Sequence, residues 1–335
     1  MDIKDFENIS AKLAEARTAV AKRVIGQPKV IDETFIAILS GGHGLLVGAP
    51  GLAKTRLVET MGAVLGLHSS RVQFTPDLMP ADILGAEVLE TSADGARAFR
   101  FIEGPVFCQL LMADEINRAS PRTQSALLQA MQEHHVTVAG ARRDLPEPFH
   151  VLATQNPIEH EGTYPLPEAQ LDRFLLQIDV DYPDRDAERA IVLATTGIEE
   201  SGVSPVFDAA GVIAAQEAVR RMPVGESVIE AILDLVRAAR PDETASELVQ
   251  RAVNWGPSPR AAQALSLAVR ARALLDGRFA PSLADVAALA HPVLRHRMAL
   301  GFAARAEGLT IDGIIDTLVS GITGAGAGAG AGAVA

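Results

Sequence analysis

The sequence predicts an α/β domain built around a parallel sheet, followed by a second domain made of helices. The first observation is the length of 335 residues, which suits two domains. The second is an alternation of short apolar runs with helical stretches between residues 45 and about 182, which is typical of parallel α/β structure. The third is that helical periodicity alone continues from there to about residue 320. Hydrophobic residues make up 48% of the chain, enough to form a sizeable core.

Two helices are predicted at the beginning of the chain. Between residues 3 and 22 apolar residues recur at spacings of three and four, as on one face of an amphipathic helix: Ile3, Phe6, Ile9, Leu13, Ala16 and Val20. Pro28 suits the first position of the next helix, because a residue there needs no backbone N–H donor. We expect this second helix to run to about Ser40.

Short apolar runs are then predicted as the strands of the sheet: 45–47, 72–74, 108–113, 151–153 and 175–180. Continuous apolar runs of this length are typical of strands that are buried on both faces. Helical stretches separate most of these runs, so we expect helices on both faces of the sheet.

Two segments have the character of β-hairpins. Residues 87–90 and 98–102 flank Asp94-Gly95, a strong turn signal. Residues 136–138 and a stretch near 143–145 flank Ala139-Gly140. We expect hairpin inserts near 85–103 and 135–147.

The domain boundary is expected near residue 195, with the α/β core at 1–195 and the helical domain at 196–320. Residues 197–205 are predicted as a hinge between them. Residues 321–335 end in alternating glycine and alanine, which has no face that can pack, so we expect a flexible tail.

The composition excludes several classes of protein. The formal net charge is −12 and the isoelectric point about 5.2, which argues against coating nucleic acid or an anionic membrane. The single cysteine, Cys108, excludes a disulfide framework and a CxxC zinc site. The first residues lack the apolar run of a signal peptide, and no stretch reaches the roughly 18 apolar residues of a membrane helix. We therefore expect a cytoplasmic protein with no integral membrane segment.

A glycine-containing loop follows the first predicted strand and precedes a helix over 56–65. Its residues are Gly48, Ala49, Pro50, Gly51, Leu52, Ala53, Lys54 and Thr55, with Arg56 opening the helix. Backbone N–H groups of such a loop converge on an anion, and the helix N-terminus adds roughly half a positive charge. Lys54 would bridge the β- and γ-phosphates of a nucleotide, and the Thr55 hydroxyl would coordinate Mg²⁺.

One residue departs from the usual phosphate-loop pattern. Ala53 occupies the position of a second glycine before the lysine. Alanine has the next smallest side chain, so a tight loop is compatible with it if the backbone angle φ is negative there. On the loop alone, an ordinary strand–turn–helix connection is the alternative.

Asp114 and Glu115 follow the apolar strand 108–113 directly. Ionised groups resist burial unless they have a partner, and a Mg²⁺–phosphate cluster would supply one. Asp114 would hold the metal ion, while Glu115 would orient and deprotonate the attacking water. The alternative is that the two carboxylates cap the helix that follows at Ser120-Pro121.

A third strand, 150–154, ends in Gln155-Asn156-Pro157. Ligands of open α/β sheets bind at the carboxyl ends of strands, where this segment and both motifs above lie. We select Asn156 to contact the γ-phosphate and the attacking water, with Gln155 and Thr154 as alternates. Taken alone, Asn-Pro is simply a turn.

Together these residues resemble the MoxR family of the AAA+ ATPases. The resemblance covers nearly the whole chain before the Gly-Ala tail. It is most specific in three segments: LMADEINRA at 111–119, QSALLQAMQE at 124–133 and ATQNPIEHEGTYPLPEAQLDRF at 153–174.

The resemblance implies an AAA+ core, a P-loop NTPase αβα sandwich with a parallel sheet, followed by an all-helical lid domain. It implies that Val24, Ile25 and Gly26 line the adenine pocket and that the two hairpins project from the body to engage partners. Members form rings, typically hexamers, bind ATP and Mg²⁺, and act as chaperone-like remodellers beside proteins with a von Willebrand factor A domain. The client itself is not identified by the resemblance.

Two arginines match family positions that complete the site. Arg173 matches the position expected to reach the γ-phosphate of a neighbouring subunit; the alternative is an ion pair with Asp172 or Asp184. Arg260, at the start of a lid helix, resembles a second arginine that contacts phosphate, either in its own subunit or across the interface. Arg118 and Arg122 are weaker candidates, more simply interpreted as solvated helix residues.

The leading hypothesis is a Mg²⁺-dependent ATPase whose ring remodels a partner protein. A chelatase-like subunit that drives metal insertion shares the same site chemistry and differs only in its partner. A nucleic-acid motor is disfavoured by the acidic charge and the aromatic content of 4%, so no nucleic-acid partner is expected.

Overall fold

The central element of the fold is a five-stranded parallel sheet in the order β2-β5-β8-β1-β9. The computed structural model describes residues 3–91, 97–158, 162–196 and 202–328, with side chains up to Ile322. The strands are β1 (Gly44–Val47), β2 (Ser69–Gln73), β5 (Leu110–Asp114), β8 (His150–Gln155) and β9 (Leu176–Asp179). Each of the five overlaps an apolar run predicted as a strand, although β2 begins three residues before its predicted run, 72–74.

Side chains of successive strand residues enter two separate hydrophobic cores. On β1, Leu45 belongs to one core and Leu46 to the other. On β5, Leu111 and Met112 alternate in the same way. Because neighbouring strand residues point to opposite faces, both faces of this sheet are buried, as the continuous apolar runs predict.

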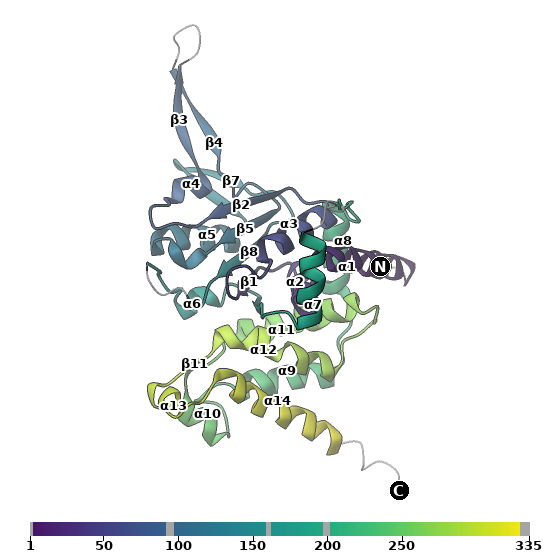
Figure 1. The fold of residues 1–335 in the computed structure, drawn as a ribbon. Helices are drawn as coiled ribbons and strands as arrows, with labels where there is room; N and C mark the ends of the chain where they lie inside the picture. The colour runs from purple at the N-terminus through teal and green to yellow at the C-terminus, as the bar shows by residue number, and fades with distance from the viewer. Residues whose placement is uncertain (1–2, 92–96, 159–161, 197–201, 329–335) are drawn as a thin grey trace.

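Helices cover both faces, which confirms the αβα sandwich (Figure 1). One core contains residues of α1 (Ile3–Arg23), α2 (Pro28–Leu39), α3 (Lys54–Leu65) and α8 (Ala209–Arg221). The other contains residues of α4 (Pro80–Leu84) and α5 (Pro121–Glu133). A 3₁₀ turn, η1 (Ile116–Arg118), follows β5, and α6 (Glu168–Leu171) and α7 (Arg185–Thr195) flank β9.

Helices dominate the C-terminal part of the chain. They are α9 (Glu226–Ala238), α10 (Glu247–Ala252), α11 (Pro259–Leu275), α12 (Leu283–Leu294), α13 (Phe302–Ala306) and α14 (Ile311–Gly328), with a 3₁₀ turn η2 (Arg295–Arg297). One short antiparallel ladder, β10 (Val253–Trp255) with β11 (Ala299–Leu300), interrupts the predicted all-helical pattern. These strands are too short to give a period, so the sequence did not predict them.

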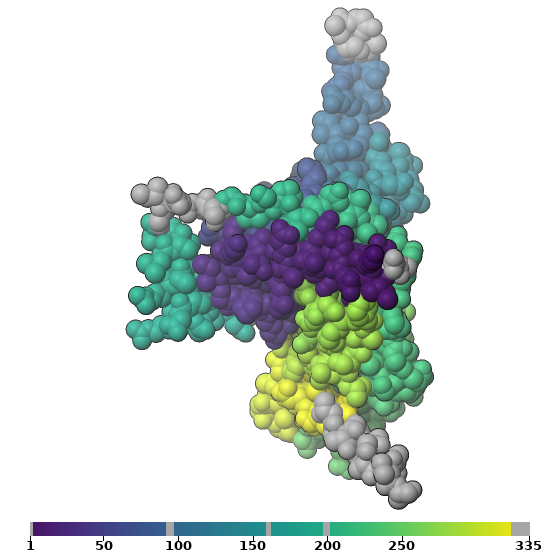
Figure 2. Space-filling model, turned by 90° about the vertical axis from the view of Figure 1, so that its right-hand side faces the viewer, coloured from purple at the N-terminus to yellow at the C-terminus, as the bar shows by residue number. Residues whose placement is uncertain are grey.

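The C-terminal helices pack directly on the N-terminal part of the chain. The α11 and α12 side chains share one hydrophobic core with α1 and α2. The Phe6 ring on α1 stacks on the Phe279 ring, with 4.3 Å between ring centroids. Figure 2 shows α1, in purple, lying across this face directly above the green helices.

Both predicted hairpins are present. β3 (Gly85–Thr91) pairs with β4 (Arg97–Glu103) and projects away from the sheet (Figure 1). The predicted Asp94-Gly95 turn lies outside the described residues. β6 (His135–Val138) pairs with β7 (Ala141–Asp144). The Arg143 guanidinium on β7 lies 3.8 Å from the centre of the Phe101 ring on β4, so the second hairpin supports the base of the first.

The structure differs from the sequence prediction at the C-terminal end. Helix α14 continues through Gly328, eight positions into the segment from 321 for which we expect a flexible tail. Extending an existing helix orders only one further residue for each hydrogen bond formed, without a new nucleation step. Alanine is the best helix former, so each alanine offsets part of the free-energy cost of a neighbouring glycine. Most of the predicted hinge, residues 197–201, lies outside the described residues. Within the described ranges, no helix has the length and apolar character needed to cross a membrane.

Candidate functional site

The loop between β1 and α3 has the backbone geometry of an anion-binding loop. A Cβ atom on Gly48 would lie 2.4 Å from the carbonyl oxygen of Val180, so only glycine fits beside the end of β9. Gly51 has a φ of +83°, a left-handed conformation that glycine adopts without strain. The loop runs directly into α3, whose first turn presents free N–H groups. It contains Gly48, Ala49, Pro50, Gly51, Leu52 and Ala53, and Lys54, Thr55 and Arg56 form the first turn of the helix.

Ala53 corrects one expectation from the sequence. Its φ is +57°, not negative, so this alanine lies in the left-handed region that favours glycine. A Cβ atom in this region comes close to the next carbonyl oxygen and costs about 1–2 kcal/mol. The loop therefore keeps the conformation of the usual glycine pattern and accepts the strain of an alanine.

The Lys54 ammonium group lies inside this loop. It donates hydrogen bonds to the carbonyl oxygens of Gly48 and Ala49. Burial lowers the pKa of Lys54, while the nearby carboxylates of Asp114 and Glu115 act in the opposite direction. The loop follows β1 and the acidic pair ends β5, and both strands are parallel members of one sheet, so the loop and the pair lie at the same edge.

Asp114 is held at the end of β5 by two neighbours. Its Oδ2 accepts a hydrogen bond from the Arg71 guanidinium at 2.6 Å, and its Oδ1 accepts one from the Thr154 hydroxyl at 2.6 Å. Asp114 is only 8% exposed, so these charge-assisted bonds offset the cost of burying the carboxylate.

Glu115 lies beside it in a strained conformation, with a φ of +56°. Its Oε2 accepts hydrogen bonds from the Gln73 amide at 2.7 Å and from Arg118 at 3.1 Å. Its backbone N–H donates to the Thr154 hydroxyl oxygen at 2.8 Å. Thr154 thus joins the two acidic residues directly.

The acidic pair does not cap the following helix. Ser120 is the N-cap of α5, where its side chain accepts a hydrogen bond from the Thr123 N–H group. The capping alternative is therefore wrong.

Asn156 follows β8 at the same edge of the sheet. Its Oδ1 accepts a hydrogen bond from the Ile158 N–H group at 3.1 Å, so the side chain also closes the turn that Asn-Pro indicates. The alternate Thr154 is the residue of this strand that contacts both Asp114 and Glu115. Gln155 ends the strand and pairs with Val47 of β1 in the parallel register.

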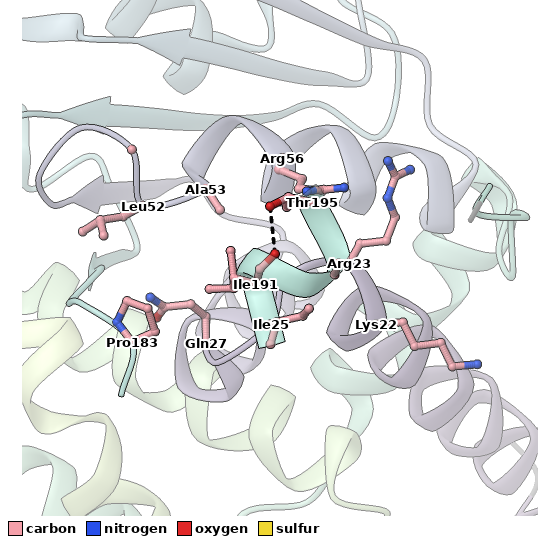
Figure 3. A pocket seen from close by; sticks show the side chains of 12 residues that line it. Lys22, Arg23, Ile25, Gln27, Leu52, Ala53, Arg56, Pro183, Ile191 and Thr195 are labelled. Atoms are coloured by element: carbon pink, nitrogen blue, oxygen red, sulfur yellow. Dashed lines mark hydrogen bonds between the residues drawn. The ribbon is translucent and has the colours of Figure 1, made fainter. Parts of the chain in front are cut away.

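A cavity of about 190 Å³ opens beside the loop (Figure 3). Its lining comes from the end of α1 and the turn that follows it, the loop before α3 with the first turn of that helix, and α7 with the segment before it: Lys22, Arg23, Ile25, Gln27, Gly51, Leu52, Ala53, Arg56, Pro183, Ile191, Ala194 and Thr195. The walls combine apolar side chains with a few polar groups, the composition expected of a site for an aromatic base.

Of the predicted adenine-pocket residues, Ile25 lines this cavity. Val24 is buried in the core behind it. Gly26 has a φ of +78°, and a Cβ atom there would lie 2.5 Å from that of Ala187 on α7. The wall that α7 supplies was missed, although Ile191, Ala194 and Thr195 recur at the helical spacing of three and four that could have indicated it.

Arg173 and Arg260 lie together at the other end of the sheet. Both line a second cavity, of about 230 Å³, together with His43. His43 directly precedes β1, and Arg173 precedes β9, which is parallel to β1. The loop that carries Lys54 follows the carboxyl end of β1. The two arginines are therefore at the opposite end of this strand from the phosphate-binding loop.

The ion pairs considered for Arg173 do not form. The two carboxylate oxygens of Asp172 accept hydrogen bonds from Arg297 at 2.7 Å and from Ser258 at 2.9 Å. Asp184 instead caps the first turn of α7. No ion pair joins Arg173 to another residue in the described part of the chain.

The residues at the carboxyl edge of the sheet fit a magnesium ion. Among the described residues there is no cluster of three His, Cys, Asp or Glu side chains that could enclose a metal ion. Mg²⁺ is usually bound by one or two protein oxygens together with substrate phosphates and water. One hydroxyl, Thr55, and one carboxylate, Asp114, beside an anion-binding loop match that requirement.

Residues 43–176 match the family model described as "ATPase family associated with various cellular activities (AAA)", and residues 245–318 match an AAA lid domain. The chain is similar to Chaperone MoxR1 of Mycobacterium tuberculosis, with 40% identity over 92% of this chain and 81% of the relative. It is also similar to Protein MoxR of Paracoccus denitrificans, with 33% identity over 91% and 94%. A crystal structure of a proposed ATPase from Cytophaga hutchinsonii has a TM-score of 0.87 and 37% identity, covering 94% of this chain and 96% of that one.

Proposed function

The chain belongs to the MoxR family of AAA+ ATPases, and we propose that it hydrolyses ATP with Mg²⁺ in a ring, typically a hexamer, to remodel a partner protein. The observation that carries this proposal is the geometry of the sheet, in which the loop with Lys54 follows β1 and the pair Asp114 and Glu115 ends the parallel strand β5 at the same edge. A cation for phosphate and two carboxylates, one for a metal ion and one for a water, are the groups that phosphoryl transfer to water requires.

We assign the binding of ATP to three features. The adenine base occupies the 190 Å³ cavity, between Ile25 on one side and Ile191 of α7 on the other. The triphosphate lies along the loop, where N–H groups and the first turn of α3 stabilise its charge. Lys54 then exchanges its contacts with loop carbonyls for the β- and γ-phosphate oxygens.

Thr55 and Asp114 would hold Mg²⁺, which neutralises charge that develops on the phosphate oxygens. Glu115 accepts the proton of a water while the water oxygen bonds to the γ-phosphorus. The bond from that phosphorus to the β–γ bridging oxygen breaks, giving ADP and phosphate. Thr154 holds the backbone of Glu115 in place, and Asn156 orients the water.

A second copy of the chain would complete the site with Arg173 and Arg260. These arginines are at the opposite end of β1 from Lys54, which supports action across a subunit interface over action in their own subunit. A guanidinium placed on the γ-phosphate contributes about 10³–10⁵-fold to turnover in NTPases. This arrangement is the reason that we propose a ring.

The remodelling part of the proposal rests on the relatives. One relative is named a chaperone, and we infer the same activity for this chain. A partner protein with a von Willebrand factor A domain and a cytoplasmic setting belong to the same proposal, on the resemblance and composition given above. The projecting β3–β4 hairpin, with Leu89 and Phe99 exposed near its end, is the surface that we propose meets the partner or client.

The substitution Glu115→Gln tests the hydrolytic step. The amide cannot accept a proton, so turnover should fall by about 10²–10⁴-fold while ATP affinity stays close to that of the wild type. Steady-state phosphate release and titration with a fluorescent ATP analogue measure the two quantities. Glu59→Gln makes the same change on the exposed side of α3 and should leave both unchanged. Equal turnover in Glu115→Gln and wild type would remove Glu115 from the role of base.

A further inference from the structure

We propose that Asp172, Ser258 and Arg297 form a buried positioning device that holds Arg173 and Arg260 in a fixed relation to each other. This inference rests on the proposed function, in which the two arginines act on the ATP of a neighbouring subunit. It assigns a role to three residues that neither bind nucleotide nor line the cleft beside the loop.

Arg297 on η2 is the anchor. It is 1% exposed, the largest of the fully buried side chains described. All five of its N–H donors are used. Nε donates to Oδ1 of Asp172, and the two terminal nitrogens donate to backbone carbonyl oxygens of Asp172, Phe174, Leu175 and Val293. Four of the five bonds therefore end on the segment 172–175, which contains Arg173.

Asp172 connects this anchor to the lid helix α11. Its Oδ2 accepts a hydrogen bond from the Ser258 hydroxyl at 2.9 Å. Ser258 is the N-cap of α11, and its Oγ also accepts a hydrogen bond from the N–H group of Arg260 at 3.2 Å. One carboxylate thus fixes the backbone that carries Arg173 on one side and the start of the helix that carries Arg260 on the other.

The buried ion pair of Asp172 and Arg297 is better explained by its effect on orientation than by its effect on stability. Removing a guanidinium and a carboxylate from water costs nearly as much as their attraction returns, so a buried ion pair adds little over apolar side chains of the same size. It does, however, require one particular arrangement of donors and acceptors. Because Arg297 and Ser258 use both oxygens of Asp172, that carboxylate does not draw the Arg173 side chain away from the cavity that Arg173 shares with Arg260.

The mildest test is Ser258→Ala, which removes one hydrogen bond and empties no large space. ATP affinity should be kept, because ATP lies at the opposite end of β1, while kcat should fall by about 10–100-fold, the effect of a displacement near 1 Å. Ser258→Thr keeps the hydroxyl and should recover most of the turnover. Ser227→Ala, an exposed serine of α9, is the matched control without effect. Wild-type kcat in Ser258→Ala would overturn the proposal.

Arg297→Met is the stronger variant, and mixed rings show where its defect lies. Lys54→Ala subunits cannot hydrolyse ATP but still offer well-placed arginines to a neighbour. Mixing them with Arg297→Met subunits should raise turnover at least tenfold above that of either variant alone. A mixture that stays inactive, while a parallel mixture of Arg173→Ala with Lys54→Ala recovers, would contradict the positioning role and leave the proposed function intact. If the parallel mixture also fails, action across the interface is wrong and this inference fails with it. Thermal unfolding checks that each variant folds. If Arg297→Met does not fold, the turnover of Ser258→Ala decides whether the positioning role is correct.

Discussion

The two ends of strand β1 carry two functional regions that are built in different ways. At its carboxyl end, the phosphate-binding loop and the acidic pair are each continuous in sequence, and each directly follows a buried strand. At its amino end, the arginine pair is held by residues from three distant segments, at positions 172, 258 and 297. The first region uses backbone N–H groups and strand ends, and the second uses a buried ion pair.

The arginine end depends on the whole fold more than the loop end does. The loop keeps its shape largely through local contacts, such as the hydrogen bonds that Lys54 donates to the carbonyl oxygens of Gly48 and Ala49. Arg173 and Arg260 keep their relative position only while the lid helices stay packed on the sheet. We call the contact between the sheet and the helices that follow it in the chain the junction. We therefore expect conditions that weaken the junction to displace the arginines before they disturb the phosphate-binding loop.

Acid is the strongest such condition. Among the described residues, three buried histidines near the amino end of the sheet resist protonation. Burial lowers the pKa of His43 to about 3 and that of His150 to about 4, and it holds the pKa of His296 well below its usual value. In the unfolded chain these histidines bind protons near pH 6.5, whereas in the folded chain they do not. The free energy of unfolding is therefore highest above that pH and falls as the pH drops below it. Burial raises the pKa of Glu33 to about 7, so the folded chain binds this proton before the unfolded chain does. Lowering the pH below 7 therefore stabilises the fold through Glu33, which opposes the effect of the histidines.

The three histidines outnumber Glu33, so we expect a net loss of unfolding free energy on the order of 1–3 kcal/mol per pH unit between pH 6 and 5. Chemical denaturation at a series of pH values measures the slope. His150→Asn removes one of the groups and should reduce the slope by about 1 kcal/mol per pH unit. His68→Asn, at an exposed position, should leave it unchanged. An unaltered slope in His150→Asn would show that the junction is not the acid-sensitive region.

A smaller effect on stability is expected at the loop end, from Ala53. Ala53→Gly relieves the left-handed strain, worth about 1–2 kcal/mol, but gives the unfolded chain more freedom, worth about 0.4–1 kcal/mol. We expect a net gain of about 0.5–1 kcal/mol in unfolding free energy, with ATP affinity unchanged because the loop keeps its backbone conformation. Urea denaturation measures the gain.

Ala63→Gly is the matched control for that substitution. Ala63 is exposed in the last turn of α3 and has helical backbone angles, so the same change there should cost roughly 0.5–1 kcal/mol. If both variants lose stability, the conformation assigned to Ala53 is wrong.

Much of the fold and of the loop end could be predicted from the sequence. Buried parallel strands give continuous apolar runs, and their order along the chain places the loop, Asp114 and Asn156 at one edge. The hydrogen-bond partners of the acidic pair could not be predicted in the same way. Arg71 and Gln73 have the spacing of residues on one face of a strand, but which strand lies beside β5 depends on the order of the sheet.

The arginine end was predictable only by resemblance. Nothing local to Arg297 indicates that its guanidinium is buried, and its partner Asp172 lies 125 positions earlier in the chain. The sign of φ at Ala53 was also hidden, because alanine is normally found at negative φ and the sequence contains no signal for strain.

Complementation between two inactive subunits tests whether neighbouring subunits share one active site. Arg173→Ala subunits have a complete ATP cleft and lack the arginine, while Lys54→Ala subunits have the arginine and lack the lysine that binds phosphate. We predict that each alone shows little ATP hydrolysis and that their mixture regains a substantial fraction of wild-type turnover, since one subunit supplies what its neighbour lacks. A mixture no more active than its separate components would contradict the claim that opposite ends of β1, in adjacent subunits, form one active site.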